Sequence, residues 1–185
     1  MSEKFNPDGP EAMFVQADAL IEAGNTVGAA ELLSRLIDQF PTFGRAYNHL
    51  GYLWETKFRD LVKAETYYKA CLQYSPEYPA IYYNYAVLLS TQERWEELED
   101  LLSRALQVKG ITKAKIYNEF AIMHEVKSNY SEAIEAYRQA IKYSFSQKDI
   151  HTYRNSMART LEKQTFFEQL NDKDRPTGSI PREWN

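Results

Sequence analysis

The sequence predicts an all-α protein built from repeated helix pairs, and three observations support this fold class. Stretches of about 12 to 16 residues rich in Ala, Leu, Glu, Tyr and Lys carry apolar residues at three- and four-residue spacing, which indicates amphipathic helices. No stretch sustains an alternation of apolar and polar residues, so strands are not expected. One sequence pattern also recurs at a nearly fixed interval along most of the chain.

Two series of mostly small residues define that interval. The first series steps by 34, 35 and 35 residues and consists of Ala17, Gly51, Ala86 and Ala121. The second series lies in the following helical stretch, steps by 35, 34 and 35 residues and consists of Ala29, Ala64, Leu98 and Ala133. Two independent series with one period predict a stack of similar units at residues 10–43, 44–78, 79–112 and 113–147.

Each unit is expected to contain two helices joined by a short turn. In each turn an Asn or Asp side chain is suited to cap the second helix, and the turns read Gly24-Asn25, Arg59-Asp60 and Ser128-Asn129. Prolines, which cannot continue a helix interior, mark the junctions between units at Pro41, Pro76 and Pro79.

The full pattern is clear in the second unit, which reads Tyr47-x-x-Leu50-Gly51-x-x-Trp54 and then Ala64-x-x-x-Tyr68-x-x-Cys71. The third and fourth units follow it from Tyr82 and Tyr117, and a degenerate copy begins at Met13. A small residue such as Gly51 lets two helix backbones approach closely where they cross, while larger side chains fill the space beside the crossing.

A capping helix is expected over residues 149–170, because Tyr153, Met157, Ala158 and Leu161 form one helical face and no complete second helix follows. Residues 171–185 are polar with two prolines, so a mobile C-terminal tail is expected there. Residues 1–9 are expected to form a flexible N-terminus, which leaves a single domain over residues 10–170.

These motifs resemble the tetratricopeptide repeat (TPR) family over residues 10–163, with the full motif in the second and fourth units. The resemblance implies an α-solenoid in which paired antiparallel helices stack into a right-handed superhelix with a concave groove. It also implies that the first helix of each pair lines that groove.

One stripe of residues on each first helix is therefore expected to point into the groove. Asn recurs at the same repeat position in three of five units, and its amide suits an extended peptide backbone because it offers both a donor and an acceptor. Tyr52, Tyr83 and Ile122 are expected to form apolar pockets between the amides. The candidate binding residues are Phe14, Asp18, Asn48, Tyr52, Tyr83, Asn84, Asn118, Ile122, Asn155 and Arg159, and ordinary surface positions are the alternative interpretation.

Charged residues along the groove suggest a ligand orientation. The first unit contributes Glu11, Asp18 and Glu22, whereas later units contribute Lys115 and Arg159. A ligand is therefore expected to present basic residues to the early units and acidic groups to the late ones. Arg159 is predicted to hold a ligand carboxylate with its planar guanidinium.

Composition excludes several other classes of function. The 22 Lys plus Arg and 26 Asp plus Glu among 185 residues give a formal net charge of -4, so a nucleic-acid partner is not expected. The single cysteine, Cys71, excludes an intramolecular disulfide and a cysteine-based zinc site. No apolar run approaches the length of a membrane span and the first residues contain no signal core, so a soluble, cytoplasmic protein without membrane insertion is expected.

No catalytic or cofactor-binding motif is recognised. The histidines His49, His124 and His151 belong to no close metal-ligand pattern, and His124 is expected to pack in the core. Neither an enzyme nor a cofactor nor a metal site is predicted. The leading hypothesis is a protein-interaction scaffold that binds an extended peptide or a partner helix in its groove. The alternative is a structural adaptor that self-associates into a homo-oligomer or docks through its convex face or its ends.

Overall fold

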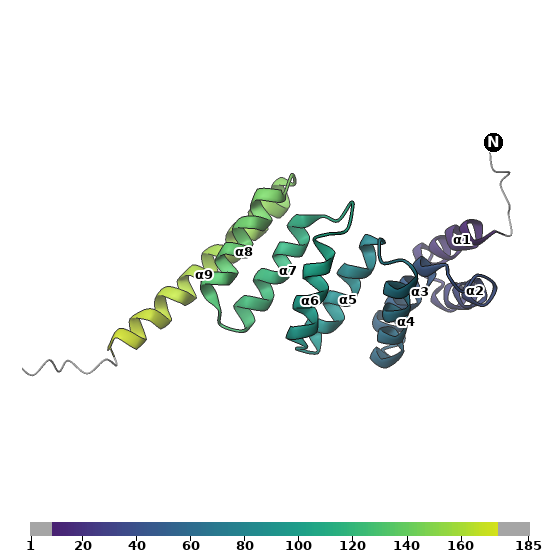
Figure 1. Cartoon of the computed structure of the whole chain (residues 1–185), viewed down its shortest axis with the longest axis horizontal. Helices are drawn as coiled ribbons and strands as arrows, with labels where there is room; N and C mark the ends of the chain where they lie inside the picture. The colour runs from purple at the N-terminus through teal and green to yellow at the C-terminus, as the bar shows by residue number, and fades with distance from the viewer. Residues whose placement is uncertain (1–8, 174–185) are drawn as a thin grey trace, which may run out of the picture. The chain divides into compact units, whose positions relative to one another are not determined.

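The computed structural model describes residues 9–173, with side chains placed through residue 170. Within these residues the all-α prediction is confirmed, because they contain helices and no strand. Figure 1 shows the helices in chain order, and their bounds are α1 (Pro10–Glu22), α2 (Thr26–Gln39), α3 (Gly44–Thr56), α4 (Leu61–Tyr74), α5 (Pro79–Thr91), α6 (Trp95–Ala105), α7 (Lys113–Val126), α8 (Tyr130–Tyr143) and α9 (Gln147–Lys173).

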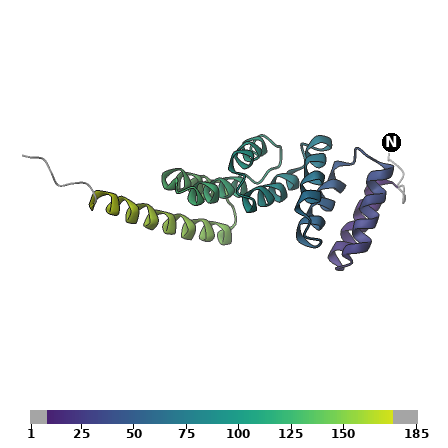
Figure 2. The ribbon, with the colours of Figure 1, turned by 90° about the horizontal axis from the view of Figure 1, so that it is seen from below.

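The chain divides into two compact units, residues 1–111 with α1 to α6 and residues 112–185 with α7 to α9. The expected single domain over residues 10–170 is therefore shared between two units. Helices that follow one another along the chain pack as pairs, namely α1 with α2, α3 with α4, α5 with α6 and α7 with α8. Each pair lies within one of the four predicted repeats, and α9 packs along α8 (Figure 2).

The turns inside the pairs share one backbone geometry. The residue before each N-cap has a positive φ, with values of 75°, 60°, 56° and 61° at Gly24, Arg59, Glu93 and Ser128. Only glycine adopts this left-handed conformation without a steric cost, so the turn is imposed on three other residue types by the helices it joins.

Two of the three predicted caps are confirmed. The side chain of Asn25 accepts a hydrogen bond from the Gly28 amide at 3.1 Å, and that of Asp60 accepts one from the Lys63 amide at 3.0 Å. Asn129 occupies the N-cap of α8, but its side chain makes no capping hydrogen bond, so that prediction is wrong.

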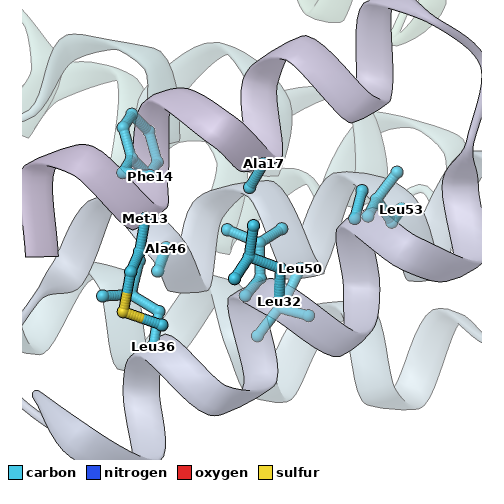
Figure 3. Packing of buried hydrophobic residues seen from close by; sticks show 10 residues of the cluster. Met13, Phe14, Ala17, Leu32, Leu36, Ala46, Leu50 and Leu53 are labelled. Atoms are coloured by element: carbon cyan, nitrogen blue, oxygen red, sulfur yellow. The ribbon is translucent and has the colours of Figure 1, made fainter. Parts of the chain in front are cut away.

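The core of the first three helices is apolar and closely packed (Figure 3). Ala17 on α1 and Leu50 on α3 are fully buried. The small side chain of Ala17 lets α1 approach its neighbours, as a small residue at a helix crossing should. The side chains labelled in the figure come from three helices and are Met13, Phe14, Ala17, Leu32, Leu36, Ala46, Leu50 and Leu53.

A second close approach lies at Gly51 on α3. A Cβ atom added to Gly51 would lie 2.4 Å from both Cδ1 and Cε1 of Tyr68, whose ring is completely buried. Tyr68 is held further by its hydroxyl, which donates a hydrogen bond to Glu55 at 2.5 Å. The predicted helix crossing therefore requires glycine at position 51.

The last helix, α9, differs from the expected cap in length and orientation. It runs unbroken from residue 147 to residue 173, where a cap at 149–170 was predicted. Its buried face contains Tyr153 and Thr160, whereas Ala158 and Leu161 of the predicted face are exposed. The predicted flexible residues 1–9 and tail 171–185 lie outside the described residues, apart from Gly9 and the helical residues 171–173.

None of the helices described between residues 9 and 173 is both long and apolar enough to cross a membrane.

Candidate functional site

A pocket of about 230 Å³ opens between the first helices of the three pairs in the unit of residues 1–111. We call it the α1–α3–α5 pocket. Four of its residues, Asp18, Asn48, Tyr52 and Asn84, belong to the stripe expected from the sequence. The complete lining is Asp18, Ile21 and Glu22 of α1, Asn48, His49 and Tyr52 of α3, and Asn84 of α5.

Two asparagines form one wall of this pocket. The Nδ2 atom of Asn84 donates a hydrogen bond to Oδ1 of Asn48 at 3.0 Å, which links α5 to α3. Asn48 is only 2% exposed. The amide of Asn48 thus serves mainly to join two helices, and the half-buried amide of Asn84 is the one better placed to meet a ligand.

The opposite wall carries two carboxylates. Asp18 lies 2.9 Å from Nε2 of His49, which holds it at the edge of the pocket, and its side chain is 41% exposed. Glu22 is exposed, and it forms no ion pair with any residue that the structure describes. No Lys or Arg lines the pocket, so it favours a positively charged group.

The third acidic residue expected in the first repeat does not add to this charge. Glu11 pairs with the guanidinium of Arg45. Arg45 also lies over the rings of Phe14 and Phe43, at 5.0 Å and 4.8 Å from their centroids. Glu11 is therefore part of a cation–aromatic cluster at the start of α3 and is locally neutralised.

Phe14 and Tyr83 do not line the pocket. Phe14 is 6% exposed and meets the His49 ring edge-on at 4.6 Å between centroids, so it is a core residue that supports His49 and not a ligand contact. Tyr83 is half-buried on α5. The repeat alignment predicted that Phe14 would point into the groove. Periodicity alone does not show which way an aromatic ring on the first helix of the stacked repeats will pack.

The remaining predicted residues lie in the unit of residues 112–185. Asn118 and Ile122 are half-buried on α7, and Nδ2 of Asn118 lies 3.4 Å from Glu119 Oε1. Asn155 is exposed on α9 and contacts His151 at 3.0 Å. Both asparagines thus have a polar neighbour on their own helix.

Arg159 was predicted to hold a ligand carboxylate, and the structure corrects this. Its Nε and Nη2 atoms donate hydrogen bonds to the two oxygens of Glu125 at 3.1 Å and 2.9 Å. Lys163 adds a third contact to Glu125 at 2.8 Å, and Tyr137 donates a fourth at 3.0 Å. The guanidinium is therefore occupied within the chain, which removes the basis for expecting acidic ligand groups at Arg159.

The electrostatics of Glu125 explain why it attracts two cations. Its side chain is only 7% exposed, and burial by itself would raise the pKa of the carboxyl. The hydrogen bonds from Arg159, Lys163 and Tyr137 outweigh burial and hold the pKa at about 2. Sequence reasoning missed this pair, in which Glu125 precedes Arg159 by 34 residues.

This lowered pKa predicts a pH-dependent difference between the wild type and Glu125→Gln. A carboxyl whose pKa falls on folding adds stability above its unfolded pKa, and that stability is lost as the pH falls toward 2. We expect the variant to be less stable by about 1–3 kcal/mol at pH 7, since Arg159 and Lys163 are half exposed. Urea unfolding at several pH values should show the two proteins converging as the pH approaches 2, and a constant gap would contradict the assignment.

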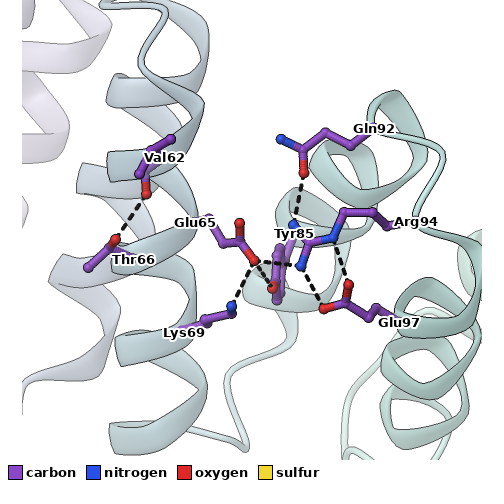
Figure 4. A network of polar contacts seen from close by, with 8 residues as sticks. All are labelled: Val62, Glu65, Thr66, Lys69, Tyr85, Gln92, Arg94 and Glu97. Atoms are coloured by element: carbon purple, nitrogen blue, oxygen red, sulfur yellow. Dashed lines mark hydrogen bonds and ion pairs between the residues drawn. The ribbon is translucent and has the colours of Figure 1, made fainter.

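A polar network of residues that do not line the pocket is structural (Figure 4). Glu65 on α4 accepts hydrogen bonds from Arg94 at 2.7 Å and from Tyr85 at 3.0 Å, and it pairs with Lys69 at 2.8 Å. Arg94 in particular lowers the pKa of Glu65 to about 2. Arg94 also binds Glu97, so the network ties α4, α5 and α6 together.

The described residues do not assemble a recognisable catalytic centre. Cys71 is fully buried, and burial raises the pKa of its thiol to about 12. His124 is half-buried with its Nδ1 atom enclosed, and its ring stacks on Phe120. Within residues 9–170, no group of three or more His, Cys, Asp or Glu side chains could hold a metal ion.

Comparison with known families decides the class of this repeat. The tetratricopeptide repeat model matches residues 2–42 and residues 14–73. Residues 2–73 of the chain therefore contain tetratricopeptide repeats. No curated protein matches the sequence.

Solved structures extend the fold beyond the matched residues. PilF of Pseudomonas aeruginosa is 19% identical with a TM-score of 0.74, over 85% of this chain and 70% of that one. TTC0263, a thermophilic TPR protein of Thermus thermophilus, is 19% identical with a TM-score of 0.65, over 83% and 84% of the two chains. PilW, described as a widely conserved type IV pilus biogenesis factor, is 13% identical with a TM-score of 0.67, over 83% and 78%. At these identities the likeness establishes the fold alone.

The tetratricopeptide repeat fold supports a general role as a protein–protein interaction scaffold, and proteins of this family are generally not enzymes.

Proposed function

We propose that this protein binds an extended peptide, or a helix of a partner protein, in a concave groove that includes the α1–α3–α5 pocket. The observation that carries the proposal is the lining of this pocket, which comes only from first helices and combines two carboxylates with an amide and a tyrosine. The carboxylates of Asp18 and Glu22 suit a basic side chain, and the Asn84 amide suits a peptide group.

The dimensions of the pocket agree with a side chain or a short peptide segment and not with a large cofactor. Its volume is about 230 Å³, below the several hundred cubic ångströms typical of sites that enclose a drug-sized molecule. Tyr52 is 37% exposed at its edge and offers an aromatic surface that orders with little loss of conformational entropy.

A second candidate function is docking through a separate groove of the same unit. This groove of about 760 Å³ is lined by Val27, Ala30, Trp54 and Phe58, together with Glu31 and Arg35. Val27 is 60% exposed and Phe58 is 37% exposed. Such a surface suits self-association or an adaptor role, because exposed apolar patches commonly mark interaction sites.

A peptide-array screen distinguishes the two candidates. We expect the wild type to select peptides enriched in Arg and Lys, and Glu22→Lys to lose them through charge repulsion at the pocket. Glu31→Lys is the matched control, because Glu31 is an exposed glutamate that lines the apolar groove and not the α1–α3–α5 pocket. It should retain the same peptides.

The opposite pattern would contradict the proposal. Loss of binding in Glu31→Lys with retention in Glu22→Lys would place the partner on the apolar groove. Light scattering during size-exclusion chromatography provides the second readout. A stable dimer that Val27→Glu dissociates, together with no selected peptide, would favour the adaptor role.

A further inference from the structure

Two glutamates occupy the same position in different repeats. Glu55 and Glu125 each lie eight residues after the tyrosine that begins the repeat pattern, Tyr47 and Tyr117. Each accepts a hydrogen bond from the buried tyrosine of the next helix, at 2.5 Å from Tyr68 to Glu55 and at 3.0 Å from Tyr137 to Glu125. The chain thus builds one carboxylate–tyrosine arrangement twice.

The copy at Glu125 shows what this arrangement binds. An arginine and a lysine from α9 donate to its two oxygens, at distances between 2.8 and 3.1 Å. Arg159 engages both oxygens, so the carboxylate accepts a guanidinium fork while the tyrosine hydroxyl donates from within the core.

The copy at Glu55 lacks these cations. Aligning the buried residues Tyr153 and Thr160 of α9 with the buried residues Ile81 and Leu88 of α5 places Arg159 at Val87 and Lys163 at Thr91, both on α5. Neither residue carries a charge, and Val87 is 52% exposed. Glu55 is half-buried, and among the described residues it forms no ion pair. Burial raises the pKa of Glu55, an effect that the Tyr68 hydrogen bond offsets only in part, which is opposite in direction to Glu125.

We propose that Glu55 binds an arginine side chain of the partner, in the place that Arg159 fills beside Glu125. This inference rests on the proposed function, because the arginine belongs to the ligand of the groove. Tyr52 lies three residues before Glu55 on α3 and also lines the α1–α3–α5 pocket. The proposed arginine site at Glu55, which we call the arginine slot, therefore adjoins that pocket. The apolar stem of the arginine contacts Tyr52 and Val87, and its guanidinium meets the carboxylate.

A substitution that places an arginine on α5 tests the arginine slot without any ligand. Val87→Arg should pair with Glu55, raise the melting temperature by roughly 2–6 °C and lower the pKa of Glu55, as Arg159 does for Glu125. The gain in melting temperature should vanish in the Glu55→Gln background, in which the amide oxygen still accepts the Tyr68 hydrogen bond. A Val87→Arg protein with unchanged stability and an unchanged Glu55 carboxyl titration by NMR would overturn the proposal.

A second experiment compares an arginine-containing peptide selected by the array with the same peptide in which citrulline replaces the arginine. Citrulline keeps the shape of the side chain and removes its charge. We expect the wild type to bind the arginine peptide roughly ten-fold or more tightly than the citrulline peptide, measured by fluorescence anisotropy. Glu55→Gln and Val87→Arg should abolish this difference. Glu99→Gln, an exposed glutamate on α6, is the control that should preserve it.

The outcomes separate this inference from the proposed function. Selected peptides whose binding ignores both citrulline and Glu55→Gln would overturn the arginine slot and leave groove binding intact. Failure of every peptide to bind would overturn the proposed function, and the Val87→Arg measurements would still decide whether Glu55 accepts a guanidinium.

Discussion

Truncation after Ser146, which removes α9, is expected to make the protein aggregate or become insoluble. The truncation uncovers Tyr137 and Ala140, which are completely buried in the intact chain, together with the neighbouring Ile141. It also removes Arg159 and Lys163, so the enclosed carboxylate of Glu125 loses both of its cations. Loss of these cations costs about 1–3 kcal/mol, since both are half exposed, and the newly exposed apolar face adds to this loss.

Soluble yield and light scattering measure the effect. A truncation after Lys173 is the control, because it keeps the whole of α9, and it should remain much closer to the full chain in yield and in melting temperature. A soluble, monomeric protein that ends at Ser146 and melts like the full chain would show that α9 is not needed to cover α8.

Gly51→Leu is expected to destabilise the protein by about 3 kcal/mol or more, because even a Cβ atom would overlap the Tyr68 ring. The ring is enclosed on all sides and its hydroxyl is bound to Glu55, so it has no alternative position. For a chain of this size the loss corresponds to a fall in melting temperature of about 6–12 °C.

A double-mutant cycle checks the cause of that loss. Gly51→Ala should already destabilise, and combining it with Tyr68→Leu should cost less than the sum of the two changes, since the smaller side chain relieves the overlap. Differential scanning fluorimetry is sufficient for the comparison. Additive losses, or an unchanged melting temperature in Gly51→Leu, would show that the close contact at this crossing is not the cause.

Much of the fold could be predicted because the same pattern of small and apolar residues recurs in each helix pair. Gly51 and Ala17 identify the helix crossings, and Asn25 and Asp60 identify the start of second helices, from local chemistry alone. The extent of α9 could not be predicted in the same way. Its buried face is rotated so that Thr160 is enclosed while Leu161 is 53% exposed, and this depends on how the helix lies against α8.

The candidate site was predictable only in part. Asp18, Tyr52 and Asn84 follow from the stripe of the first helices, because equivalent positions in stacked repeats meet on one face. Phe14 packs on His49, and Arg159 pairs with a carboxylate 34 residues earlier. In both cases the sequence identifies the face of the helix, and side-chain packing decides whether a group is free for a ligand.

We expect the partner to bind on α1, α3 and α5. A two-dimensional amide NMR titration of the full chain, with the peptide selected most strongly by the array, locates the bound peptide on the protein. Shift changes should cluster at Asp18 to Glu22, at Asn48 to Glu55 and around Asn84, with little change from Val27 to Arg35. Shift changes concentrated at Val27 to Arg35 and around Phe58, with the α1–α3–α5 pocket unaffected, would contradict it.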